Sequence, residues 1–488
     1  MKYYVCLFFY IFSLCTSVFS NSPSGNYLYR KGNKLYDNSG KEVRLTGVNW
    51  FGFETSLLVF HGLWSRDYKS MLKQIKEVGF NCVRIPWCNK MLESGSTESI
   101  NTSGKDPFTN QQMNQDLAGL KPIEVLDKTI EECGKLDLKV ILDNHSREPD
   151  AYMTEYLWYI GKYPHKKWIE DWVFLAKRYR GNDAVIGMDL NNEPHNNNNN
   201  IEFAAWGSGD PKYDWKMAAE ECGNAILKVN PNVLIIIEGV QRYKQYNYWW
   251  GGNLIGVRDH PVKLIDDSKL VYSPHEYGPE VHLQPWYQDT ADFPANMKGI
   301  WDRYFGYIYD ENIAPLLIGE FGIAHMDSFN GKAGIWFDHF LKYMAGRYSW
   351  TFWCWNPNSG DTGGILNSDW KTLTKWKIDK LKPYLAPMIK NSSVNIFDKS
   401  KKRYQSGVTI KSYLKNSYET LVQYSIPNSG TVDITLYNAK GKVLYNENKY
   451  KNSGSHYVKL DKSTVNSGIY FIKFKTANSM LIHNLITY

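Results

Sequence analysis

Short apolar runs alternate with longer amphipathic stretches from about residue 27 to residue 396. Four of the amphipathic stretches repeat apolar residues at helical spacing, and we predict helices there, at residues 68–78, 123–133, 168–179 and 217–229. The apolar runs predict eight strands, at residues 43–48, 82–86, 138–143, 185–190, 233–238, 270–273, 315–319 and 350–353. Strands that alternate with helices favour a parallel sheet, and eight of them is the number in a (β/α)8 TIM barrel. The predicted fold class of this part is therefore α/β.

The pattern changes after residue 395. Short alternating strand-like segments follow one another, at residues 431–437, 457–460 and 469–474, with turn sequences rich in Asn, Ser and Gly between them. All 18 tryptophans lie at or before Trp376. This pattern is typical of a small antiparallel β-sandwich of about 90 residues. We therefore predict two domains, residues 21–397 and residues 398–488.

Residues 1–20 have the features of a signal peptide. Lys2 precedes an apolar run at residues 5–19, and Ser20 is the small residue before a predicted cleavage at Asn21. The run has about 15 residues, whereas a membrane span needs about 20, so we prefer a signal peptide to a membrane anchor. No other segment is long and apolar enough to predict a span. The sequence therefore predicts an extracellular protein.

The net charge of +7 is distributed unequally. Residues 398–488 contain 14 Lys and Arg against 5 Asp and Glu, whereas residues 21–397 contain 42 against 45. The basic residues of the C-terminal part are scattered along alternating strands, which is typical of solvated faces. We therefore expect no nucleic-acid partner.

The cysteines do not define the fold. Five remain after removal of a signal peptide, and an odd number leaves at least one thiol unpaired within the chain. Their spacing does not resemble a zinc site, and we expect most of them to be buried structural residues.

The ends of the predicted strands carry polar and aromatic residues that a core would not favour. They are Asn49, Trp50, Arg84, His145, Asn192, Glu193, His275, Tyr277, Glu320 and Trp353. In a TIM barrel the carboxyl ends of the strands meet at one face, where the active site lies. Glu193 and Glu320 each follow an apolar run, and hydrolysis of a glycosidic bond needs such a carboxyl pair. A protein that only binds carbohydrate is the alternative, although binding would not require both glutamates.

Several segments between residues 42 and 390 resemble a glycoside hydrolase family 5 endoglucanase, a cellulase of clan A. They are residues 47–55, 61–68, 84–86, 141–145, 192–194, 248–253, 275–277, 319–322 and 350–364, in the order of the family. The resemblance implies a secreted, retaining endo-β-1,4-glucanase that acts on a β-glucan, needs no metal or cofactor, and is a monomer. A β-mannanase or a mixed-linkage glucanase with the same carboxyl pair is the alternative within the enzymes. The sequence departs from many relatives after His145, where it reads Ser-Arg-Glu.

The resemblance also implies roles for the two glutamates. Glu193 would be the general acid/base, and Glu320 would be the nucleophile that forms a glycosyl-enzyme intermediate. In a retaining enzyme the two carboxyl groups lie about 5–5.5 Å apart. The negative charge of Glu320 would favour the protonated form of Glu193, and Arg84 would keep Glu320 ionised.

Other residues would support the reaction or bind the sugar. Tyr277 is expected to hydrogen-bond the nucleophile, Asn192 to reach the sugar 2-hydroxyl, and His145 and His275 to order the site. Four tryptophans are expected to contact substrate, with Trp353 as the floor beside the cleavage point. The other three are Trp64, Trp250 and Trp50.

The C-terminal segment 431–474 resembles a different family, the Ig-like sorting domain of bacterial proteins exported by type IX secretion. The resemblance implies a contact with the secretion machinery through residues 398–488 and a possible cell-surface location. A carbohydrate-binding module is the rival interpretation. Without tryptophan it would need a row of tyrosines, such as Tyr404, Tyr413 and Tyr424. An inert sandwich is the third interpretation.

Overall fold

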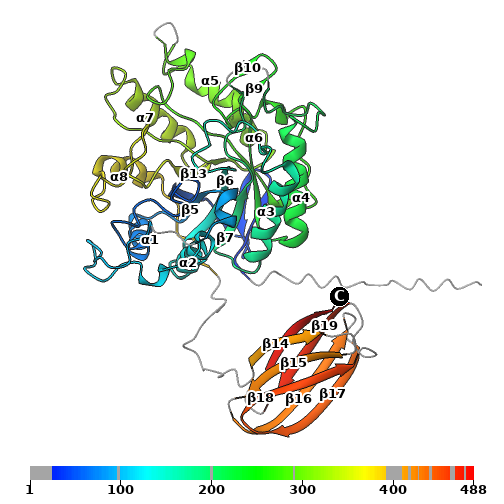
Figure 1. Cartoon of the computed structure of the whole chain (residues 1–488). Helices are drawn as coiled ribbons and strands as arrows, with labels where there is room; N and C mark the ends of the chain where they lie inside the picture. The colour runs from blue at the N-terminus through cyan, green and yellow to red at the C-terminus, as the bar shows by residue number, and fades with distance from the viewer. Residues whose placement is uncertain are drawn as a thin grey trace, which may run out of the picture. The chain divides into compact units, whose positions relative to one another are not determined.

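The computed structural model describes most of the chain in two compact units, one before residue 395 and one after it, and each is described here by itself (Figure 1). The described residues are 25–95, 99–197, 202–288, 292–391, 409–415, 419–426, 428–438, 442–461, 468–476 and 480–487. The signal peptide predicted at residues 1–20 lies outside them. Among the described residues, no helix is long and apolar enough to cross a membrane.

The first unit is a TIM barrel, as predicted. Its eight strands are β4 (Thr46–Asn49), β5 (Cys82–Cys88), β6 (Lys139–Ser146), β7 (Val185–Asp189), β8 (Leu234–Glu238), β11 (Leu270–Ser273), β12 (Leu317–Ile318) and β13 (Ser349–Phe352). They form one parallel sheet in the order β11-β8-β7-β6-β5-β4-β13-β12. Parallel bridges from Tyr272 to Leu316 and from His275 to Glu320 join the two edge strands. The backbone N–H of Glu276 donates to the carbonyl of Glu320 at 3.1 Å across this seam.

Helices surround the strands (Figure 1). They are α1 (Tyr68–Val78), α2 (Pro122–Lys135), α3 (His165–Arg178), α4 (Trp215–Val229), α5 (Met297–Trp301), α6 (Tyr307–Asp310), α7 (Lys332–Met344) and α8 (Lys375–Leu381). Helix α1 begins where the Asp67 carboxylate accepts two backbone N–H groups, and it ends at Gly79, whose φ of 107° lies in the left-handed region. The bounds predicted for α1 agree with the structure, and the predicted ends of α2, α3 and α4 differ by at most three residues.

The first predicted strand needs a correction. Val43 belongs to β3 (Glu42–Val43), which pairs with β2 (Lys34–Asp37) and β1 (Leu28–Lys31) in a small antiparallel sheet, and β4 begins only at Thr46. The remaining short elements are β9 (Arg242–Tyr243), β10 (Tyr246–Asn247), 3-10 helices at Asn89–Glu93, Gln115–Leu117, Ile255–Val257, Asp267–Lys269, Pro285–Tyr287 and Lys382–Tyr384, and a π-helical turn at Asp302–Gly306.

The five cysteines among the described residues of the barrel unit are free thiols and buried, namely Cys82, Cys88, Cys133, Cys222 and Cys354. Burial raises the pKa of each thiol, so these residues stay protonated and pack as small apolar side chains.

The second unit is built from two antiparallel sheets. Strands β14 (Thr409–Lys415), β15 (Glu419–Ile426) and β18 (Gly454–Asp461) form one, and β17 (Val443–Lys451), β16 (Gly430–Asn438), β19 (Gly468–Lys475) and β20 (Met480–Thr487) form the other. Buried side chains of both sheets share one apolar core, to which Val422, Ile434, Val458 and Ile472 belong. The sheets therefore pack face to face, as predicted for a two-layer β domain. Of the three tyrosines considered for a binding row, Tyr424 is buried in this core, and the side chains of the other two lie outside the described residues.

Candidate active site

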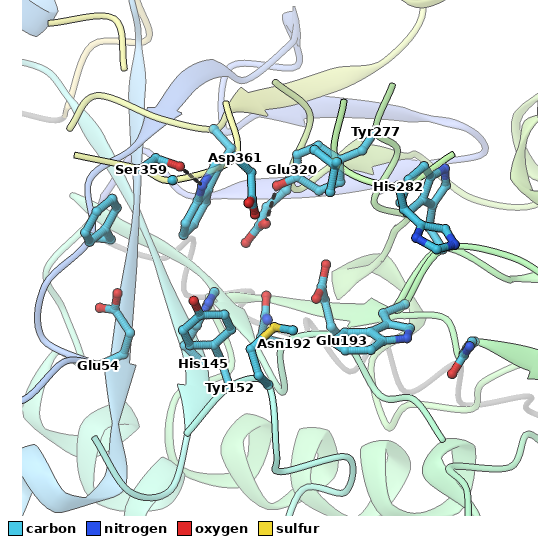
Figure 2. Close-up of a pocket in the computed structure, with 18 of the residues that line it drawn as sticks. Glu54, His145, Tyr152, Asn192, Glu193, Tyr277, His282, Glu320, Ser359 and Asp361 are labelled. Atoms are coloured by element: carbon cyan, nitrogen blue, oxygen red, sulfur yellow. Dashed lines mark hydrogen bonds between the residues drawn. The ribbon is translucent and has the colours of Figure 1, made fainter. Parts of the chain in front are cut away.

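A cleft of about 940 Å³ opens at the carboxyl ends of the barrel strands. Figure 2 shows Glu193 and Glu320 in its middle, with Glu54, His145 and Ser359 toward one end and His282 toward the other. The loops that follow the strands supply its walls, because the carboxyl ends of all eight strands face the same side. Among the residues that line it are Phe51, Glu54, His61, His145, Tyr152, Asn192, Glu193, Gln241, Trp249, Trp250, Tyr277, His282, Glu320, Trp353 and Asp361.

The two glutamates lie close together although 126 residues separate them in the sequence. A carboxylate oxygen of Glu193, one of Glu320 and a ring nitrogen of His275 lie within 4.8 Å of one another. This separation is shorter than the approximately 6.5–9.5 Å that an intervening water molecule would need.

The Glu193 residue has an unusual backbone. Its φ of 48° lies in the left-handed region, and it precedes Pro194, which further restricts the conformation. Such a conformation costs about 1–3 kcal/mol and persists only where the surroundings enforce it. The backbone N–H of Glu193 donates to Glu238 Oε2 at 2.8 Å, and the side-chain Oε1 accepts from His275 Nδ1 at 2.9 Å. Bonds to both the main chain and the side chain therefore hold the carboxyl group in one direction.

Burial raises the pKa of the Glu193 carboxyl, and the negative charge of Glu320 adds to that rise. The hydrogen bond from His275 acts in the opposite sense but does not cancel it. A raised pKa is what a group needs if it is to donate a proton near neutral pH.

Both oxygens of Glu320 are held by donors. Arg84 Nη1 lies 2.7 Å from Oε1, and the Tyr277 hydroxyl donates to Oε2 at 2.7 Å. Burial, followed by the charge of Glu320, raises the pKa of Tyr277 well above its usual value, so the phenol stays protonated and can only donate here. The sequence-based expectation that Arg84 and Tyr277 lie at this glutamate agrees with the geometry.

Arg84 also contacts three buried carboxylates that the sequence analysis did not assign to the site. Its distances are 3.2 Å to Asp143, 2.9 Å to Asp189 and 3.1 Å to Glu238. Although burial alone would lower the pKa of Arg84, the surrounding carboxylates raise it well above the usual value. Each of the three acids ends or nearly ends an apolar strand run, a signal that could have identified them. These three carboxylates lie within 4.8 Å of one another, but the guanidinium occupies the place that a cation would take.

The two expected histidines lie on either side of this network. His145 Nδ1 is 2.7 Å from Asp143 Oδ2. Although burial would lower the pKa of His145, the ion pair with Asp143 raises it to about 9. His275 lies between Glu193 and Glu238, with its Nε2 at 3.2 Å from Glu238 Oε1, and these carboxylates likewise outweigh burial and raise its pKa. Both rings therefore carry a positive charge at neutral pH.

Two of the four expected tryptophans lie in the cleft. Trp353 and Trp250 line it, Trp353 with its ring nearly parallel to His145 at 5.6 Å. Trp64 is 39% exposed and contacts His61, which lines the cleft, but Trp64 itself does not line it.

The assignment of Trp50 to substrate binding is wrong. Its ring is fully buried, stacks on Phe60 at 3.9 Å, and donates its Nε1–H to the carbonyl of His61. Strand β4 ends at Asn49, and the next side chain turns toward the core between the barrel and its loops. Asn49 instead faces the network, where its side-chain oxygen accepts from Arg84 at 3.1 Å.

Glu54 lines the cleft and was not predicted as a site residue. It is buried, its carboxylate accepts from the backbone N–H of Gly52 at 2.8 Å, and burial raises its pKa to about 7. The motif quoted for the resemblance contains it, but nothing in its spacing separates it from a solvated loop residue.

Known proteins resemble both parts of the chain. The model of the family "Cellulase (glycosyl hydrolase family 5)" matches residues 36–359, and that of a secretion system C-terminal sorting domain matches residues 418–488. An endoglucanase of Paenibacillus polymyxa is 45% identical over 367 residues, which is 74% of this chain and 88% of that protein. Endoglucanase G of Acetivibrio thermocellus is 39% identical over 415 residues, covering 75% and 72% of the two chains.

Solved structures agree. The hyperthermophilic endocellulase of Pyrococcus horikoshii is 40% identical with a TM-score of 0.66, and the match covers 75% of this chain and all of that one. The catalytic domain of the major endoglucanase of Xanthomonas campestris is 37% identical with a TM-score of 0.66, covering 74% and 99%. With the matching family model and these relatives, the chain belongs to glycosyl hydrolase family 5, the cellulase family.

Proposed function

We propose that this glycoside hydrolase is a secreted, retaining endo-β-1,4-glucanase that cleaves internal bonds of cellulose or a related β-glucan. The observation that carries the proposal is the approach of the Glu193 and Glu320 carboxylates to within 4.8 Å. In retaining enzymes the two carboxyl groups lie about 5–5.5 Å apart, so that one carboxylate reaches the sugar carbon directly, and the short approach seen here supports that class. The names of the relatives, which are endoglucanases, support a glucan substrate.

The reaction runs in two displacements. Glu320 attacks the anomeric carbon while the protonated Glu193 donates its proton to the leaving glycosidic oxygen, which yields a covalent glycosyl ester on Glu320 and releases the first product. Glu193, now ionised, then takes a proton from a water molecule while the oxygen of that water attacks the same carbon. The ester bond breaks, and both glutamates return to their initial states.

Neighbouring residues support these steps. Arg84 and Tyr277 hold the nucleophile in place and aimed at the sugar through the two 2.7 Å contacts. His275 fixes the carboxyl group of Glu193 at 2.9 Å. Asn192 lines the cleft beside Glu193 and is proposed to bind the sugar 2-hydroxyl.

Aromatic and cationic groups are proposed to bind the sugars themselves. Trp353 offers a flat face beside the cleavage point, Trp250 offers a second face in the cleft, and Trp64, which is exposed but does not line the cleft, is proposed to meet the sugar chain beyond it. The charged ring of His145 can donate a hydrogen bond from its second nitrogen to a sugar hydroxyl.

Reducing-end release tests the substrate and the nucleophile together. The purified barrel domain is assayed on carboxymethylcellulose and on galactomannan, with Glu320→Gln as the matched blank because it removes the nucleophile but little volume. We expect release from the cellulose derivative alone, and none from the variant. Release mainly from galactomannan would keep the mechanism and make the enzyme a β-mannanase. Near wild-type activity of the variant would refute the nucleophile.

The C-terminal unit is proposed to be an Ig-like domain that directs the protein through type IX secretion to the medium or the cell surface. The match of residues 418–488 to a sorting domain supports this proposal. The chain is further proposed to act as a monomer, since each barrel contains both glutamates. Export of the full chain by a type IX host, compared with a chain that lacks residues 398–488, tests the sorting role. Equal amounts of both proteins outside the cell would refute it.

A further inference from the structure

His195 lies two residues after Glu193 and is only 3% exposed. Its Nδ1 is 2.6 Å from the backbone carbonyl oxygen of Glu193. A carbonyl oxygen can only accept, so Nδ1 carries the hydrogen and donates it. Burial lowers the pKa of His195 to about 4, so the ring is neutral at neutral pH and remains a donor through one nitrogen only.

The same ring supports a wall of the cleft. His195 stacks on Trp250 with 3.8 Å between the ring centres and 6° between the planes, and Trp250 lines the cleft. The next residue, Gly251, packs on the acid/base, because a Cβ there would lie 3.2 Å from Glu193 Cα. The loop that carries Trp250 therefore passes close to Glu193 at Gly251 and reaches it through His195.

This arrangement matters because the Glu193 backbone is strained. The N–H of Glu193 is held by Glu238 at 2.8 Å, and its carbonyl is held by His195. With φ at 48° before a proline, the peptide has no local preference for the conformation it adopts. Loss of the bond from His195 would release the carbonyl, and only the bonds with Glu238 and His275 would then hold the direction of the carboxyl group.

We propose that His195 is a positioning residue that couples a sugar bound on Trp250 to the orientation of the Glu193 carboxyl. The inference rests on the proposed function, in which Glu193 protonates the leaving group. The sugar on Trp250 is then the first leaving-group sugar, since the platform touches the general acid through the His195 ring. A sugar that stacks on Trp250 steadies the His195 ring and, through the Nδ1 hydrogen bond, the direction of the acid.

Two substitutions separate the two contacts of the ring. His195→Phe keeps an aromatic ring for Trp250 but removes the donor. His195→Asn places an amide nitrogen close to the position of Nδ1 but removes the ring. The substrates are cellotetraose, whose departing sugar needs a proton, and 2,4-dinitrophenyl cellobioside, whose phenolate departs without one. Glu193→Gln serves as the reference for complete loss of acid catalysis.

We expect His195→Phe to lower kcat/KM on cellotetraose about 10–100-fold, which is a part of the 10²–10⁴-fold that a general acid supplies. On the dinitrophenyl substrate, kcat/KM should change less than about threefold. His195→Asn should keep the ratio of kcat values between the two substrates near that of the wild type and should raise KM for cellotetraose. Thermal unfolding of each variant identifies any that is not folded. If His195→Phe is not folded, His195→Asn tests the proposal by itself. A ratio of kcat on cellotetraose to kcat on the dinitrophenyl substrate that falls as in Glu193→Gln would then overturn the proposal.

The reference variant separates the two possible failures. If Glu193→Gln spares the dinitrophenyl substrate and His195→Phe loses equally on both substrates or on neither, the positioning role is refuted and the proposed function stands. If Glu193→Gln lowers kcat/KM on that substrate as much as on cellotetraose, the acid/base assignment is wrong and the role of His195 is refuted with it.

Discussion

Gly251 lies where one added methyl group would collide with Glu238, the residue that holds the backbone of Glu193. Its φ is 65°, and a Cβ built there would lie 2.1 Å from Glu238 Oε2. Gly119 provides the matched control, because its φ is 70° and a Cβ there would meet nothing within 4 Å. Gly251→Ala and Gly119→Ala therefore share the backbone penalty of a left-handed alanine, and only the first adds a collision.

The expected losses in stability and in rate follow from these distances. The left-handed backbone costs each variant about 1–2 kcal/mol of unfolding free energy. In Gly251→Ala, the contact must open by about 1 Å to reach even 3.0 Å. The oxygen that moves is the one that accepts the N–H of Glu193 at 2.8 Å, so Glu193 moves with it. A displacement of about 1 Å at a reacting group can lower the rate about 100-fold.

The assay is turnover on carboxymethylcellulose with thermal unfolding measured beside it. We expect Gly251→Ala to lose about 100-fold in kcat and Gly119→Ala to keep wild-type kcat, while both unfold at somewhat lower temperature. Equal kcat for the two variants would refute the reasoning, because it would mean that Glu238 can move without disturbing Glu193.

Three further predictions concern other parts of the molecule. Tyr277→Phe removes the 2.7 Å donor to Glu320 and should lower kcat about 10–100-fold, since a hydrogen bond to a charged group is worth about 1.5–3 kcal/mol. The unfolding temperature should stay nearly unchanged, and an unaltered kcat would contradict the prediction. The pKa of His145 is raised to about 9 by Asp143, so its contribution to stability is complete below pH 6.5 and is lost as the pH rises through 9. In urea unfolding, the wild type should therefore exceed His145→Gln in free energy of unfolding by an amount that decreases from pH 6 to pH 9.5. An amount that increases over this range would contradict the prediction. Removal of residues 398–488 should leave hydrolysis of a soluble glucan nearly unchanged, and binding to crystalline cellulose that falls with it would favour a carbohydrate-binding role instead.

Residues at strand ends were predictable because a parallel barrel places every such end at one face. His145, Glu193 and Glu320 lie at or just past the ends of β6, β7 and β12, whereas Arg84 lies within β5 and reaches Glu320 through its long side chain. The same rule failed at Trp50, because one residue past the end of a strand the chain can turn its side chain inward. Local sequence does not encode that turn, which depends on the Phe60 ring available for stacking.

The carboxylates that surround Arg84 were harder to predict from the sequence. Asp189 and Glu238 are each the single acidic residue of an otherwise apolar run, and such a residue does not by itself indicate a site. Only the closed barrel brings both carboxylates into contact with the guanidinium of Arg84. His195 gave no signal in the sequence, because a histidine after a proline has no pattern of its own. Its role emerges from a ring stacked on a tryptophan 55 positions away.

The sequence by itself determined the alternation of strands and helices and the change to a β domain near residue 395, and it singled out Glu193 and Glu320 as candidates for the catalytic pair. These features depend on periodicity and on motifs that neighbouring residues complete. The tertiary structure alone decided the approach of Glu193 and Glu320 oxygens to within 4.8 Å, the left-handed backbone of Glu193, and the raised pKa of its carboxyl group. Distances across the barrel and the extent of burial depend on the packing of all eight strands, and no local stretch of sequence contains that information.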